Sequence, residues 1–220
     1  LDKEAIRRAT SIYLPGSVIP MLPEALSNNL CSLRPNEKRL VMVVSMHINC
    51  DGRARDTTIR KAVIRSHARL TYHQVSEMIT KHQEPPEWFV SPLHDLTACY
   101  DTLMYQRQLR GSIDFEFPET KILFNKQGKI ANIVQTHRMV SHKLIEECML
   151  VANEQVAAYL LKHKIPGMYR IHKPPQTQKV ENLFMLLENY QIDFDTKKDY
   201  RPKDFQRLLK SMRKLDQHEG

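Results

Sequence analysis

The sequence predicts a mixed α/β (α+β) fold with a small mixed sheet and several long helices. Residues 40–64 contain two runs rich in β-branched side chains on either side of Asp51-Gly52, a strong hairpin turn. Residues 139–161 carry apolar side chains at helical spacing along their whole length. Residues 113–135 contain three short runs with the composition of strands. Together these three patterns favour long helices combined with short strands.

The N-terminal third combines loop and hairpin patterns. Residues 1–9 predict the end of a helix. Four prolines within residues 15–35 favour a long, irregular loop region, because proline fixes φ and has no N–H to donate. Loops of that length inside a compact domain are usually functional. Residues 40–49 then predict the first strand of the hairpin, and residues 57–64 predict its return strand.

The middle of the chain predicts two helices followed by short strands. The first helix covers residues 71–82 and ends before Pro85-Pro86, and the second covers residues 90–109 and ends at Gly111. The strands are expected at residues 113–117, 121–124 and 129–135.

The C-terminal part predicts three helices and one short strand. The longest helix, residues 139–161, is expected to form the spine of the fold, and residues 168–172 predict a short strand. Residues 177–190 predict a helix with Thr177 as its N-cap. Residues 202–215 predict a final helix that carries an apolar face: Phe205, Leu208, Leu209, Met212 and Leu215. We expect this face to fold back onto the body of the chain, to mediate self-association or to be disordered.

The net charge of +8 indicates a surface that attracts polyanions, of which phosphate backbones are the commonest inside cells. Nucleic acid is therefore the first partner to consider, although the charge is equally compatible with a role in solubility. Basic residues concentrate at 53–69 and 197–214. Either group has the chemistry to line a phosphate path, and either is also compatible with a solvated face.

The four cysteines, Cys31, Cys50, Cys99 and Cys148, include no Cys-x-x-Cys pair, so neither a disulfide framework nor a zinc site is indicated and buried thiols are expected. No apolar run is long enough for a membrane span, and the first residues lack the apolar core of a signal peptide. We expect a soluble, cytoplasmic protein. The start at Leu1 also suggests a fragment of a longer chain.

An ordered set of irregular motifs near the N-terminus is the most specific feature of the sequence. It comprises Thr-Ser-Ile-Tyr-Leu-Pro at 10–15, Ile-Pro-Met-Leu-Pro at 19–23 and Leu-Cys-Ser-Leu-Arg-Pro-Asn-Glu at 30–37. This order resembles the catalytic domain of the ribonuclease II and ribonuclease R family, and the Cys-Ser-Leu run favours the ribonuclease R branch. The resemblance is specific from residue 1 to about residue 175 and vague beyond it.

The resemblance implies that residues 1–220 are the central part of one ribonuclease II-like catalytic domain. The magnesium-binding aspartates of the family precede this motif order, and its Ser-Pro-Ile-Arg-Arg-type motif follows it. Both are absent from these 220 residues.

Two aromatic residues resemble the family's base-stacking pair. Tyr13, in a Pro-rich loop, matches the tyrosine that stacks near the 3′-terminal nucleotide, and Phe115 matches the phenylalanine that clamps the bases from the other side. Stacking on an aromatic ring ignores base identity, as a non-specific exonuclease requires. Ser112 replaces a family glycine, and Phe117 is the alternative to Phe115. Packing of the loop or of the core is the structural alternative for both aromatic residues.

Two further residues resemble groups that contact ribose. Tyr72 matches a tyrosine that touches a sugar near the active site, and its hydroxyl has the chemistry to bind a 2′-OH. Glu146 resembles the glutamate that holds a ribose hydroxyl near the cleaved end. Glu146 and Glu147 interrupt an apolar run, and a buried carboxylate is costly unless something binds it. The two lie about 100° apart on a helix, so at most one faces the core.

The acidic group Asp193, Asp195 and Asp199 is mixed with lysines and is expected to be solvated, so we assign no metal ligand and no catalytic residue within this chain.

The resemblance implies a parent protein that is a processive, hydrolytic 3′-to-5′ exoribonuclease. It would use Mg²⁺, release nucleoside 5′-monophosphates and bind the single-stranded 3′ end of RNA, with no membrane and no small-molecule cofactor. This chain would supply the RNA clamp, and alone it is expected to be inactive and able to self-associate. The alternative is a non-catalytic RNA-binding or regulatory module of the same fold.

Overall fold

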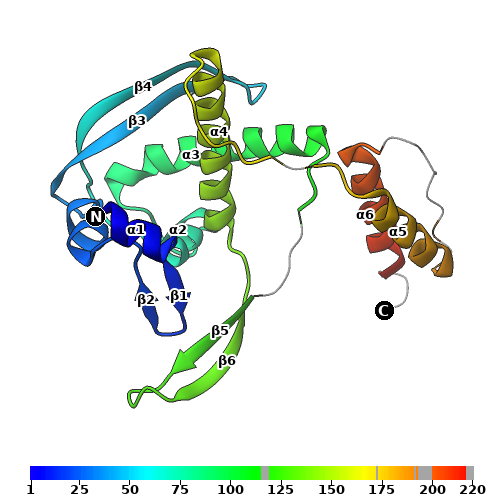
Figure 1. The fold of residues 1–220 in the computed structure, drawn as a ribbon, viewed down its shortest axis with the longest axis horizontal. Coiled ribbons are helices and arrows are strands. Elements are labelled where there is room, and N and C mark those ends of the chain that lie inside the picture. The colour runs from blue at the N-terminus through cyan, green and yellow to red at the C-terminus, as the bar shows by residue number, and fades with distance from the viewer. Residues whose placement is uncertain (115–118, 172, 191, 193–199, 217–220) are drawn as a thin grey trace.

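The computed structural model describes residues 1–114, 119–171, 173–190, 192 and 200–216. Figure 1 shows hairpins and helices grouped around α3 and α4, with a pair of C-terminal helices, α5 and α6, beside one end of α3. The mixed α/β class predicted from the sequence is confirmed.

The N-terminal segment is more regular than predicted. It contains α1 (Asp2–Arg8), β1 (Ile12–Leu14), β2 (Ser17–Ile19) and a short π-helix, η1 (Ala25–Leu30). β1 and β2 pair in antiparallel fashion around Gly16, whose φ of 80° suits glycine. The prediction of an irregular loop was wrong here, because three-residue strands are too short to show an alternating pattern.

The predicted central hairpin is confirmed as β3 (Lys38–Ile48) and β4 (Ala54–Arg65), which pair in antiparallel fashion. Its turn end packs on α3, since a Cβ added at Gly52 would lie 3.0 Å from the main-chain oxygen of Thr102. The Thr57 hydroxyl on β4 donates a hydrogen bond of 2.8 Å to the side-chain oxygen of Gln155 on α4. The hairpin is thus tied to both long helices.

Three helices form the centre of the molecule: α2 (Tyr72–Ile79), α3 (Glu87–Arg110) and α4 (Val140–Lys162). Thr71 caps α2 through a capping box with Gln74, and Gly111 ends α3 with a φ of 91°. The buried apolar side chains of these helices are Met78, Leu93, Leu103 and Leu144. This small core positions α3 against α4.

A third hairpin, β5 (Glu119–Phe124) with β6 (Ile130–Thr136), is also antiparallel. Within the described residues the strands form three two-stranded antiparallel sheets, where the sequence predicted one small mixed sheet. Ile113 and Asp114 lie outside any strand, and the rest of the predicted strand at 113–117 falls outside the described residues.

The C-terminal helices α5 (Thr177–Asn189) and α6 (Pro202–Asp216) form a second small core through Val180, Leu187 and Leu208. The N-cap of α5 is Gln176 and not Thr177, which lies inside the helix. Residues 168–171 form no strand, contrary to the prediction, and His172 lies outside the described residues.

The predicted apolar face of the last helix folds back onto the body of the chain. Leu208 is buried, and the Phe205 ring lies 5.8 Å from that of Tyr200, which in turn lies 5.4 Å from that of Phe184 on α5. The side chain of Leu215 is not among those described. Folding back is therefore the outcome, among the three expected, that the structure shows.

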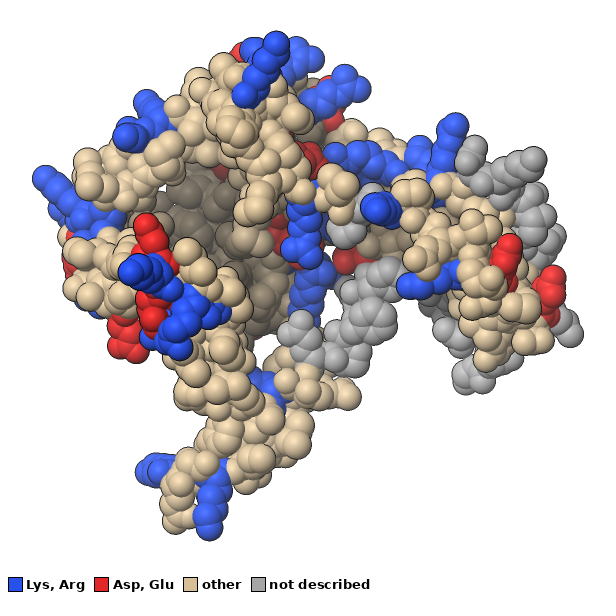
Figure 2. All heavy atoms as spheres, in the orientation of Figure 1, with Lys and Arg blue, Asp and Glu red and all other residues tan. Residues whose placement is uncertain are grey.

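The surface of the chain is large for its size. Its accessible area is 18283 Å², whereas a compact monomer of this mass exposes about 10,500 Å². Figure 2 shows a deep hollow in this face between the N-terminal hairpins and α4. On the outward face of the central hairpin, Leu40 and its cross-strand partner Val63 are exposed.

Among the described helices, none combines the length and apolarity needed to cross a membrane.

Candidate functional site

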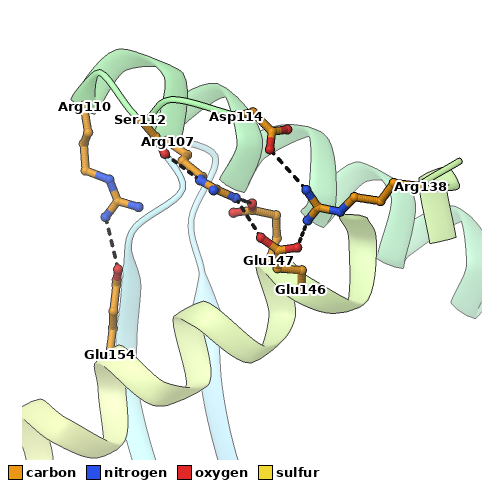
Figure 3. Close-up of polar contacts among 8 residues, drawn as sticks. All are labelled: Arg107, Arg110, Ser112, Asp114, Arg138, Glu146, Glu147 and Glu154. Atoms are coloured by element: carbon orange, nitrogen blue, oxygen red, sulfur yellow. Dashed lines mark hydrogen bonds and ion pairs between the residues drawn. The ribbon is translucent and has the colours of Figure 1, made fainter. Parts of the chain in front are cut away.

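The first half of α4 carries a cluster of charged side chains that joins three segments of the chain. Figure 3 shows Arg107 from the last turn of α3, Arg138 from the segment before α4, and Glu146 and Glu147 from α4 itself, with Asp114 beside them. Arg138 forms ion pairs with Glu146 and, at 3.1 Å, with Asp114. Two guanidinium groups and three carboxylates thus meet at one place.

Arg107 supports this cluster from the core side. Its Nη1 pairs with the carboxylate of Glu147 and lies 3.4 Å from Oε1 of Glu146, while its Nε donates a hydrogen bond of 2.8 Å to the Ser112 hydroxyl. The Glu147 side chain is 4% exposed and that of Arg107 is 17% exposed. A buried carboxylate needs a cation and hydrogen bonds, and Arg107 supplies both.

The structure reverses the burial of the acidic pair on which the sequence argument rested. Glu147 is the residue that faces the core, and Glu146 is the more exposed of the two, at 31%. The cost of burying a carboxylate therefore accounts for the pairing of Glu147 with Arg107. The case for Glu146 as a ribose-binding group rests on its place at the rim of the cluster and on the family resemblance, and it stays a prediction.

Tyr72 lies against the same helix, one turn before Glu146. Its ring stacks on that of His142, with centroids 4.0 Å apart, and its main-chain oxygen accepts a hydrogen bond of 2.7 Å from the Ser141 hydroxyl. His142 and Glu146 are four residues apart and share one face of α4. Tyr72 is 46% exposed, and it stacks on the residue one helical turn before Glu146.

Of the two predicted stacking residues, the structure describes Tyr13 but not Phe115. Tyr13 lies on strand β1, not in an irregular loop, and is 79% exposed. A Cβ at Gly16, in the turn of that hairpin, would lie 3.5 Å from the ring of Phe124 on β5, so the β1–β2 hairpin approaches β5. Phe115 lies outside the described residues, but Asp114 directly before it belongs to the charged cluster.

A pocket of about 350 Å³ opens beside the cluster. It is lined by Tyr100, Met104, Arg107, Gln108, Ser112, Asp114 and Lys143. Burial raises the pKa of the Tyr100 hydroxyl, so this phenol stays protonated at neutral pH and can donate a hydrogen bond. The pocket brings basic, acidic and hydroxyl groups next to the segment that leads to Phe115.

The described residues do not form a magnesium site. Within them no three His, Cys, Asp or Glu side chains come together in a way that could hold a metal ion, and each carboxylate of the cluster is paired with arginine. Asp193, Asp195 and Asp199 lie outside the described residues.

Two of the four thiols are exposed, contrary to the prediction of buried cysteines: Cys31 and Cys50. Cys99 and Cys148 are half-buried, and burial raises the pKa of both. On the face shown in Figure 2, lysine and arginine side chains form a column near the middle of the view and several separate groups elsewhere. Residues 197–199 of the second basic group lie outside the described residues, and a role of either group in lining a phosphate path stays a prediction.

Sequence reasoning missed the two arginines that organise the site. The acids Asp114, Glu146 and Glu147 lie close to apolar segments, and this pattern indicates that cationic side chains pair with them in the fold. The partner of Glu147 is 40 residues away in the sequence, however, and only the packing of α3 on α4 identifies it.

Comparison with known proteins places the chain in a family. The model of the RNB domain matches residues 1–219. Ribonuclease R of Escherichia coli is 41% identical over 215 residues, which cover 96% of this chain and 26% of that protein. Ribonuclease R of Aquifex aeolicus is 39% identical over 211 residues, covering 94% of this chain and 30% of the relative.

Solved structures agree with the sequence comparison. Mycoplasma genitalium RNase R in complex with ribose methylated single-stranded RNA matches with a TM-score of 0.90 and 33% identity, covering 96% of this chain and 34% of that one. The chain therefore spans about a quarter to a third of the length of these relatives. The chain belongs to the RNB domain family.

Proposed function

We propose that the full-length protein containing this chain is a processive, hydrolytic 3′-to-5′ exoribonuclease that degrades RNA to nucleoside 5′-monophosphates. The observation that carries the proposal is the match, at a TM-score of 0.90 over 96% of the chain, to an RNase R solved with single-stranded RNA. The net charge of +8 supports the same partner, because cations that neutralise phosphates supply most of the sequence-independent affinity.

Within that enzyme the chain supplies contacts to the RNA. Tyr72 and Glu146 bind riboses near the cleaved end, which is supported by the stacking of Tyr72 one turn from Glu146 on α4. Tyr13 and Phe115 stack on terminal bases. The exposure of Tyr13 supports its part, since a ring that packed a core would be covered.

The hydrolytic step depends on Mg²⁺ in this proposal, with ligands outside the described residues. Magnesium supplies charge stabilisation at the phosphodiester and lowers the pKa of bound water. The described side chains orient the RNA and do not take part in that step. A cytoplasmic location also belongs to the proposal.

The test uses the purified full-length protein and a 5′-labelled single-stranded RNA. We expect stepwise shortening from the 3′ end, release of nucleoside 5′-monophosphates, loss of activity with EDTA and recovery with Mg²⁺. A 3′-blocked RNA should resist degradation. Binding without any shortening would favour the non-catalytic RNA-binding module instead, and internal cleavage of the blocked RNA would contradict exonucleolytic action.

The contribution of Glu146 is tested by Glu146→Gln, which removes the charge and keeps the shape. The matched control is Glu154→Gln on the same helix, whose partner is the exposed Arg110. We expect Glu146→Gln to slow degradation of RNA while Glu154→Gln does not. Equal rates in both variants would remove Glu146 from the proposed site.

A further inference from the structure

Arg138 links Glu146, which the proposed function assigns to ribose, to Asp114 in the segment that follows α3. One terminal nitrogen of its guanidinium donates to Oδ1 of Asp114 at 3.1 Å, and the other pairs with Oε2 of Glu146 (Figure 3). The planar guanidinium presents its donors in a fixed fork, so it sets the distance between the two carboxylates.

Glu146 is held by arginine on both of its oxygens. Arg138 engages Oε2, and Arg107 lies 3.4 Å from Oε1. Arg107 is itself fixed by the buried Glu147 and by the Ser112 hydroxyl. An exposed glutamate side chain ordinarily samples several rotamers, whereas this one is held in a single orientation. A carboxylate has about four lone-pair sites, so acceptor capacity is left for a ribose hydroxyl.

We propose that Arg138 is a positioning residue that fixes the Glu146 carboxylate for ribose recognition by tying it to Asp114. Arg107 supports it by holding Glu146 and Ser112 from the core side. This inference rests on the proposed function and concerns how the proposed exoribonuclease discriminates between RNA and DNA ends.

The control is an ion pair between α3 and α4 that lies outside the cluster. Arg110 on α3 pairs with Glu154 on α4 at 3.6 Å, and both side chains are more than half exposed. This pair touches neither Asp114 nor Glu146. Removing it takes away an arginine–glutamate ion pair between α3 and α4 and leaves the contacts of Arg138 intact.

The experiment compares two substrates in the full-length protein. One is an RNA, and the other is the same RNA with 2′-deoxy nucleotides at its last positions. The readout is the ratio of kcat/KM for the two ends. We expect Arg138→Ala to reduce that ratio about tenfold, in line with the loss of a charge-assisted hydrogen bond that orients the acceptor. Arg110→Ala should leave the ratio unchanged.

Two more variants separate positioning from general structure. Arg138→Lys keeps the charge but cannot span two carboxylates, so the ratio should stay reduced although the fold is kept. In the double variant Arg138→Ala with Glu146→Gln, the ratio should fall no further than in Glu146→Gln alone. If Arg138→Ala does not fold, the ratio measured for Arg138→Lys tests the proposal in its place.

The outcomes are distinguishable. If the wild-type protein does not shorten RNA at all, the proposed function fails. If it does, and if both Arg138 variants keep the wild-type ratio or the double variant shows additive losses, Arg138 does not act through Glu146 and the inference is overturned.

Discussion

Gly111 ends α3 directly against the main chain of Lys203 in α6. A Cβ added at Gly111 would lie 2.6 Å from the Lys203 nitrogen, and the φ of 91° is itself unfavourable for any other residue. Close by, the Gln206 side-chain amide donates to the main-chain oxygen of Gln108 at 3.2 Å and to that of Ser112 at 3.3 Å. This contact attaches the C-terminal helices to the end of α3, where the charged cluster begins.

The variant Gly111→Ala should therefore loosen α6. Its matched control is Gly128→Ala, where φ is 74° and nothing lies within 4 Å of the added Cβ, so only the backbone strain is shared. We expect Gly111→Ala to destabilise by about 1–3 kcal/mol more than the control, because the added carbon meets main-chain atoms. Hydrogen exchange of α6 amides in the full-length protein measures this. Equal protection of α6 in both variants would refute the close packing.

The variant Arg107→Ala should destabilise the junction of α3 and α4 strongly. It leaves the carboxylate of Glu147 buried without its cation, and removing one partner of a buried pair costs about 3–5 kcal/mol. Arg110→Ala, which removes an exposed pair, should cost about 0–1 kcal/mol. Thermal unfolding combined with exchange protection of α4 gives both values. The double variant Arg107→Leu with Glu147→Leu should recover most of the loss, and a double variant as unstable as the single one would argue against this account.

The four thiols should react in two classes. Burial raises the pKa of Cys99 and of Cys148, so a smaller fraction of each is thiolate at a given pH, and the thiolate is the nucleophile. In the folded 220-residue chain we expect iodoacetamide near pH 7.5 to modify Cys31 and Cys50 first. The rates of the slow pair should rise more steeply as the pH increases. Peptide mass spectrometry assigns the order, and early modification of Cys148 would contradict it.

Replacing the exposed ring of Tyr13 with alanine should affect RNA handling more than folding. The side chain is 79% exposed on β1, so little packing is lost, while each stacked base contributes about 1–3 kcal/mol to binding. We expect weaker RNA binding or a changed length of the final product in the full-length protein. Val18→Ala, at the cross-strand partner of Tyr13, is the control for the hairpin itself. Unchanged affinity and product length would leave Tyr13 without a stacking role.

The isolated 220-residue chain should not release nucleoside monophosphates from RNA. Its described residues bring no metal-binding group together, and two-metal hydrolysis needs several converging carboxylates. Incubation of the purified chain with labelled RNA and Mg²⁺ tests this. The full-length protein is the positive control. Monophosphate release by the chain that survives nuclease-free controls would show that a metal site exists within it.

Helix boundaries followed closely from the sequence because their signals are local. The capping box of Thr71 with Gln74, Pro86 before α3 and Gly111 after it act within a few residues of the helix ends. Thr177 failed as an N-cap because the backbone already turns into the helix at Gln176, which a side-chain preference does not register. The β1–β2 hairpin was missed because the turn at Pro15-Gly16 also fits an irregular loop.

The candidate site was only partly predictable, because its contacts join residues that are far apart in the sequence. Glu146 and Tyr72 were proposed from motifs, but their relation depends on α2 packing against α4, which the stacking of Tyr72 on His142 shows. The burial of Glu147 and its pairing with Arg107 depend on the rotation of two helices about their axes. Such long-range relations leave no periodic signal in a single sequence.

The hydrogen bond from Gln206 to Ser112 spans 94 residues of sequence and has a consequence for the order of assembly. Ser112 also receives the bond from Arg107, only five residues away, so its local support exists as soon as α3 has formed. Its second support waits for α6. At typical rates of synthesis the intervening stretch takes roughly 5–20 s to emerge, so Ser112 has only its bond from Arg107 during that interval. The end of α3 is thus completed late, and a nascent chain that stalls before α6 lacks the hydrogen bond from Gln206.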